Sequence, residues 1–234
     1  MNLIERYRLN RQSFQLLGRS LNQDQENCVV AATPEWTIRD VFAHMAGVAD
    51  DVLSGRLEGV ATDPWTAVQV EARQGNSLSE LVTEWESTAP LLEELLMPMA
   101  DQVDPRLVID LWSHEQDVRG TSGTPGGDHG ETLDWIVELV VSGWTTRLER
   151  SDLDPLRIEV MASSDESSDQ RAKALPTTSE GLLRIAPYEV ARVAVGRRSI
   201  QQIMRYDWQG VPNPLEYVDL LVAFTPATHD IVDA

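Results

Sequence analysis

Two histidines and one aspartate have the residue types and the spacing needed to hold a metal ion. Asp110 and His114 lie four positions apart in a segment with apolar residues at helical spacing. A helix would therefore present a carboxylate oxygen and an imidazole nitrogen one turn apart on one face. His44 stands three after Val41 and four before Val48, so it should also point inward. Three protein ligands with one open position are typical of a catalytic zinc site.

The aspartate adds a second argument for a metal. Asp110 stands three after Leu107 and four before His114, which places it on the side of the helix that should face the core. A buried, ionised carboxylate without a partner costs several kcal/mol, so a cation, a hydrogen-bond network or a raised pKa must offset that cost. For each histidine taken alone, an ordinary hydrogen-bonded core side chain is the alternative. His129 and His229 lie in a Gly-rich loop and a polar tail and should be exposed to solvent.

The first 150 residues contain the amphipathic patterns that would position these ligands. Apolar residues recur there at spacings of three, four and seven, which is typical of helices that bury one face. Pro90 should kink or interrupt one of them. The expected helices span about residues 2–21, from Thr37 to just before Gly55, from Ser77 to about residue 95, from Asp104 to Gly120, and about residues 133–148.

The pattern changes near residue 150, which predicts two domains, 1–150 and 151–234. Residues 156–160 and 181–185 read as strands, and 187–195 read as a helix. Residues 200–206 fit either a helix or a strand, because the segment is short. The polar run SSDESSDQ at 163–170 predicts a solvated loop or a hairpin tip. The expected fold class is mainly α with a smaller α/β part.

Charge and composition exclude several classes of function. The chain has 234 residues and a formal net charge of −19, which repels nucleic acids and anionic membrane surfaces. No run approaches the roughly 20 apolar residues of a membrane span, and the charged N-terminus lacks a signal core, so we expect a cytoplasmic protein. A single cysteine, Cys28, excludes an internal disulfide framework and a cysteine-based zinc site.

Three segments resemble one known family. Residues 35–46, EWTIRDVFAHMA, are similar to the opening signature of the mycothiol-dependent maleylpyruvate isomerase family, where a Trp-Thr-x-Arg-Asp-x-x-Ala-His run ends in a metal ligand. Residues 110–119, DLWSHEQDVR, followed by Pro125 and Gly126, resemble its second metal segment, although some members have Glu at the position of Asp110. The GRRS at 196–199 and YDWQG at 206–210 resemble elements of its smaller domain.

The resemblance implies a DinB-like four-helix bundle that holds a divalent metal, with zinc as the expected ion, through His44, Asp110 and His114. It also implies a small α+β C-terminal domain and mycothiol as the thiol cosubstrate. The partners would be this small-molecule thiol and an electrophilic substrate, with no nucleic acid and no membrane, in a monomer or a homodimer.

Further residues have possible roles around such a site. Arg73, Arg197 and Arg198 are candidate catalytic residues, because a guanidinium suits bidentate recognition of a carboxylate on substrate or thiol, and Arg198 is also a candidate for binding the cosubstrate. A solvated basic face is the alternative. Asp117, one turn beyond His114, could fix the tautomer of that ligand or be an ordinary surface carboxylate. Three tryptophans fit either a pocket lining or the core, namely Trp36, Trp85 and Trp112.

The function that we predict is a metal-dependent thiol S-transferase or thiol-dependent isomerase of the mycothiol type. A metal-activated thiolate would attack a small electrophile to give a stable conjugate or a transient adduct. A non-catalytic binding or regulatory protein that keeps the bundle is one alternative, and a metal-assisted hydrolase is another.

Overall fold

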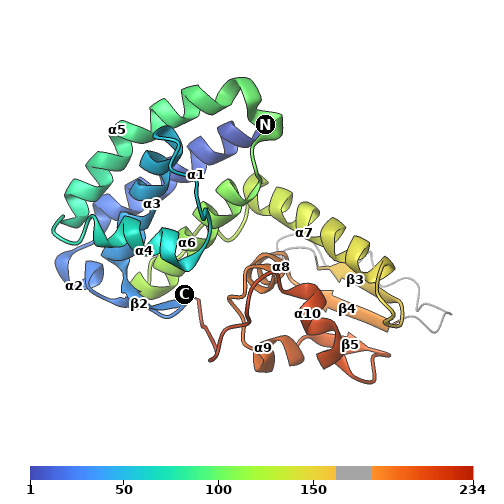
Figure 1. Ribbon diagram of the computed structural model, residues 1–234. Helices are drawn as coiled ribbons and strands as arrows, with labels where there is room; N and C mark the ends of the chain where they lie inside the picture. The colour runs from blue at the N-terminus through green and yellow to red at the C-terminus, as the bar shows by residue number, and fades with distance from the viewer. Residues whose placement is uncertain (162–180, 234) are drawn as a thin grey trace. The chain divides into compact units, whose positions relative to one another are not determined.

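The computed structural model describes residues 1–161 and 181–233, and its chain forms two compact units (Figure 1). Met1–Gly126 belongs to the first unit and Gly127–Val232 to the second. The predicted fold class, mainly α with a helix bundle and a smaller α+β part, is confirmed. The units differ from the predicted domains 1–150 and 151–234 in one helix, α7 (Glu131–Glu149), which belongs to the second unit.

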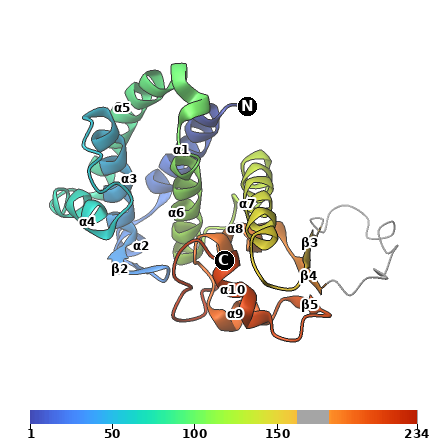
Figure 2. The same cartoon turned by 45° about the vertical axis from the view of Figure 1, so that its right-hand side comes forward.

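The first unit is built around a four-helix bundle, whose members are α1 (Leu3–Ser20), α3 (Ile38–Leu53), α5 (Leu78–Leu96) and α6 (Arg106–Ser122). Helices α1 and α3 each pack against both α5 and α6, as Figures 1 and 2 show. The predicted capping box begins α3: the Thr37 hydroxyl accepts from the Asp40 amide, and the Asp40 carboxylate accepts from the Thr37 amide. This fixes the start of the helix that carries His44.

Aromatic side chains fill the bundle core. The ring of Phe14 on α1 lies 4.6 Å from that of Phe42 on α3 and 5.7 Å from that of Trp85 on α5, measured between centroids. A Cβ on Gly18 would approach the Phe42 ring to 2.6 Å, so the glycine makes room on α1 for that ring. Burial of these rings, together with apolar side chains of α6 such as Val108 and Leu111, is the main term that holds the four helices together.

Helix α6 ends later than predicted. It continues through Gly120 to Ser122, and Gly123 ends it with a φ of +66°. Of Gly120 and Gly123, only Gly123 has the left-handed conformation that glycine adopts without strain. Helix α5 runs through Pro90. The first unit also contains elements that were not predicted: α2 (Gln23–Glu26), β1 (Val29–Val30), β2 (Thr33–Thr37), α4 (Asp63–Glu71) and the 3-10 helix η1 (Met97–Gln102).

The second unit places helices beside a three-stranded sheet. Its order is β3 (Leu156–Val160), β4 (Gly181–Ile185) and β5 (Asp207–Gln209), with β3 and β4 parallel and β5 antiparallel to β4. The helices are α7, α8 (Pro187–Ala194), α9 (Ile200–Met204), η2 (Pro214–Tyr217) and α10 (Val218–Leu221). The ambiguous segment 200–206 therefore forms a helix over most of its length. The polar run at 163–170 lies outside the described residues.

Trp144 explains why α7 belongs to the second unit. Its side chain is buried in the cluster that also contains Leu183 and Val190, and its indole N–H donates to the Leu221 carbonyl at 2.7 Å. A buried tryptophan needs both the apolar contact and the hydrogen bond, and the second unit supplies them.

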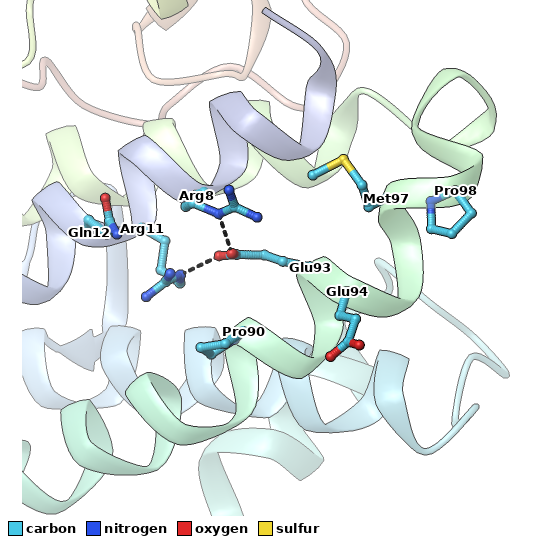
Figure 3. A pocket seen from close by; sticks show the side chains of 8 residues that line it. All are labelled: Arg8, Arg11, Gln12, Pro90, Glu93, Glu94, Met97 and Pro98. Carbon is cyan, nitrogen blue, oxygen red and sulfur yellow. Dashed lines mark hydrogen bonds and ion pairs between the residues drawn. The ribbon is translucent and has the colours of Figure 1, made fainter.

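A charged cluster borders a cavity of about 630 Å³ between α1 and the end of α5 (Figure 3). Glu93 accepts from Arg8 Nε at 2.6 Å and from Arg11 Nε at 2.8 Å. Arg11 and Glu93 are both almost fully buried, and Arg11 also donates to Gln15 at 2.6 Å. The carboxylate therefore holds a buried guanidinium in place between the two helices.

Candidate metal centre

The three predicted ligands meet in the first unit. His44 comes from α3, and Asp110 and His114 come from α6. One ligand atom of each lies within 4.8 Å of the other two. The Asp110 carboxylate bridges the pair, because Oδ2 lies 3.5 Å from His44 Nε2 and Oδ1 lies 3.5 Å from His114 Nε2.

These separations fit a shared ion better than hydrogen bonds. An N–H···O bond spans about 2.7–3.2 Å between heavy atoms. Two atoms that both ligate a tetrahedral zinc, each about 2.0–2.2 Å from it, lie about 3.3–3.6 Å apart. Both distances from Asp110, one from each carboxylate oxygen, fall in the second range. Two imidazoles and one carboxylate are also a donor set that zinc accepts, so the residues present fit a divalent metal.

Asp110 is not buried, contrary to the prediction. Its side chain is 47% exposed, whereas His44 and His114 are 3% and 5% exposed as residues. The cause is its place near the start of α6: residues 111–118 are all buried, whereas Arg106 and Asp110, which share a row with His114 but lie nearer the N-terminal end of the helix, are exposed. Burial of the Asp110 carboxylate therefore does not require a cation, and the convergence of the three ligand atoms is the observation that indicates a metal.

Each histidine contacts a polar partner through its other ring nitrogen. Asp117 Oδ2 lies 3.4 Å from His114 Nδ1, a distance within ion-pair range but longer than a normal hydrogen bond. The Asp117 side chain has no exposed surface, so it is not the surface carboxylate of the alternative interpretation. His44 Nδ1 lies 2.7 Å from Gln69 Oε1. Partners of this kind orient ligating imidazoles in metalloproteins.

Trp36 on β2 lies beside both candidate histidines. Its ring centroid is 5.3 Å from that of His44 and 6.1 Å from that of His114, and its side chain is half-buried. Trp85 and Trp112 are core residues. Of the three tryptophans, Trp36 is therefore the one that borders the candidate site. His129 and His229 are exposed, as predicted.

The three candidate arginines are engaged with the protein itself. Arg73 donates to Glu84 at 2.6 and 2.8 Å and lies 3.3 Å from Asp50. In the second unit, Arg198 forms a two-pronged pair with Glu189 at 2.6 and 2.7 Å. Arg197 donates to the Val195 carbonyl at 3.3 Å. The first two pairs brace the fold, and the role of all three in binding a ligand stays a prediction.

The Glu189 pair predicts a pH dependence of stability. Burial by itself would raise the pKa of Glu189, but the bonds from Arg198 and Tyr206 hold that pKa below its usual 4.5. Below pH 4.5 the unfolded chain takes up this proton before the folded one does, so the unfolding free energy should fall as pH drops through the depressed pKa. Urea unfolding between about pH 3 and 6 should show a smaller decrease for Glu189→Gln than for the wild type. Equal decreases would contradict this assignment.

Gln69 is the site residue that the sequence did not reveal. It lies on α4, which is separated from α3 by a loop, and no motif or spacing relates it to His44. Nothing in the sequence marks this residue, because its burial, to 2% exposure, is evident only in the fold.

Comparison with known proteins gives a limited likeness. No protein-family model matches the chain, and no curated protein is matched. Two solved structures are similar, both of a mycothiol-dependent maleylpyruvate isomerase, the second being a histidine-to-alanine mutant. They are 15% and 14% identical, with a TM-score of 0.48, and the alignment covers 83% of this chain and 88% of each of theirs.

The length and hydropathy of the helices bear on the prediction that no segment spans a membrane. Across 1–161 and 181–233, no helix has the length and apolar character that a bilayer span requires.

Proposed function

We propose that the chain is a metal-dependent thiol S-transferase or thiol-dependent isomerase of the mycothiol type, with zinc as the metal, acting in the cytoplasm as a monomer or homodimer. One observation carries the proposal: His44 Nε2, His114 Nε2 and the Asp110 carboxylate converge from two helices at ligand spacing. The sequence resemblance at residues 35–46 and 110–119 supports mycothiol as the thiol.

His44, Asp110 and His114 would supply three donors to the ion, and the Asp110 side chain is 47% exposed, so a fourth ligand would enter from the solvent side. A divalent cation there would lower the pKa of a coordinated thiol, and the thiolate is the nucleophilic form at neutral pH. Trp36 supplies an apolar wall beside the two imidazoles.

The transferase and isomerase reactions begin with the same bond-forming step. The thiolate sulfur forms a bond to an electrophilic carbon. In a transferase, the leaving group departs with its electron pair and the conjugate is the product. In an isomerase, the adduct rotates about a carbon–carbon bond, and the same sulfur–carbon bond then breaks to return the thiolate. Arg73, Arg197 and Arg198 are the proposed residues for holding a carboxylate of substrate or cosubstrate, and Arg198 in particular for the cosubstrate.

A thiol titration tests this function. Mycothiol at about 100 times its Kd should stabilise the zinc-loaded protein by about 2.7 kcal/mol, because it binds the folded state alone. The matched control is the same titration after removal of zinc, where the gain should vanish. Stabilisation by zinc but by no thiol in a panel would contradict the thiol function and favour the hydrolase alternative. Failure to bind zinc at all would favour a non-catalytic protein.

A further inference from the structure

Helix α4 has a single buried side chain, and that side chain is polar. Among residues Asp63–Glu71, all within the described part of the chain, only Gln69 is buried. A helix on the outside of a bundle normally buries apolar groups, and a buried amide costs free energy unless it is hydrogen-bonded. The hydrogen bonds of Gln69 therefore explain why this residue occupies the position.

A chain of hydrogen bonds runs from the metal ligand through Gln69. Its Oε1 lies 2.7 Å from His44 Nδ1, and its Nε2 donates to Asp51 Oδ2 at 2.7 Å. The other oxygen of Asp51 accepts from Arg56 Nε at 2.8 Å. We call these three residues, Gln69, Asp51 and Arg56, the His44 relay.

The order of donors and acceptors along the relay follows from the chemistry of its groups. An ionised carboxylate accepts hydrogen bonds and cannot donate them, so Asp51 must face the NH₂ group of Gln69. The amide oxygen then faces His44, and an oxygen acceptor requires a proton on Nδ1. The lone pair of His44 consequently lies on Nε2, which is the nitrogen near Asp110.

We propose that the relay holds His44 in the Nδ1-protonated tautomer and so presents its Nε2 lone pair to a metal. Gln69 and Asp51 are positioning residues in this account, since neither touches the ion. The inference rests on the metal centre of the proposed function. It concerns a different property, namely which ring nitrogen of His44 carries the proton when no metal is bound.

Two features hold α4 in the place that the relay needs. A Cβ on Gly47 of α3 would lie 2.5 Å from Gln69 Cβ, so the absence of a side chain there lets the amide reach His44. Arg73 donates to the Gln69 carbonyl at 3.2 Å while it pairs with Glu84 of α5. The first contact places the Cβ of Gln69 against α3, and the second holds its backbone carbonyl.

The first test reads the tautomer directly. In the full-length protein freed of metal, ¹⁵N NMR of the imidazoles should show His44 protonated on Nδ1. Asp51→Asn should lose this preference, because an amide at position 51 can donate to Gln69 and so lets the Gln69 amide turn over. Asp50→Asn is the matched control: Asp50 contacts Arg56 and Arg73 but has no bond to Gln69, so the tautomer should not change. A wild-type His44 protonated on Nε2 would overturn the proposal.

The second test reads metal affinity with zinc and a competing chelator. Gln69→Leu and Asp51→Asn should each weaken zinc binding by about 10–100-fold, whereas Asp50→Asn should bind like the wild type. Wild-type affinity in both relay variants would also overturn the proposal. If the wild type itself binds no zinc, the proposed function fails, while the tautomer measurement still decides the relay.

Discussion

Replacing His44 or His114 by alanine should weaken zinc binding more than loss of a residue that orients a ligand, which costs about 10–100-fold, because each change removes a proposed ligand. Two ligands that remain cannot complete the three-ligand set of a catalytic zinc site. Chelator competition measures the affinity. The ring contacts of Phe14 with Phe42 and Trp85 in the bundle core involve neither histidine.

The helical circular dichroism of both variants should therefore match that of the wild type. His129→Ala is the control, since His129 is exposed and lies outside the site. Zinc affinity that stays at the wild-type value in His44→Ala would remove this residue from the site.

Replacing Glu93 by alanine should lower the unfolding free energy by about 3–5 kcal/mol. The change leaves the buried guanidinium of Arg11 without its carboxylate, and Gln15 alone cannot offset the buried charge. Denaturant unfolding at neutral pH gives the value.

The neighbouring residue provides a matched control for this effect. Glu94 is exposed beside the same cavity, so Glu94→Ala should change stability by no more than about 0.5 kcal/mol. A loss below about 1 kcal/mol in Glu93→Ala would show that Arg11 finds water or another partner when Glu93 is absent.

The bundle was predictable from the sequence because its helices bury one face each. Apolar residues at helical spacing and the capping boxes at Thr37 and Ser77 located α3 and α5 closely. Helix α4 carries no such stripe, since Gln69 is its one buried residue, and it was missed. Sequence spacing also could not decide which of Gly120 and Gly123 ends α6, because only the backbone conformation distinguishes them.

In the candidate site, too, some features were predictable from the sequence and others were not. Helical spacing placed the two histidines on buried faces correctly, because apolar residues flank each of them at a spacing of three or four along its helix. It misplaced Asp110, since a helical stripe says which residues share a side but not where the neighbouring helices end. Gln69, the partner of His44, could not be predicted from the sequence, because the contact between α3 and α4 depends on the loop that joins them and on Gly47.

A crystal structure of the zinc-loaded protein tests the central claim most directly. We expect one strong anomalous peak about 2.0–2.2 Å from His44 Nε2, His114 Nε2 and an Asp110 oxygen, with a non-protein ligand in a fourth position. An anomalous peak elsewhere, or none at this site in crystals grown with zinc, would contradict the account.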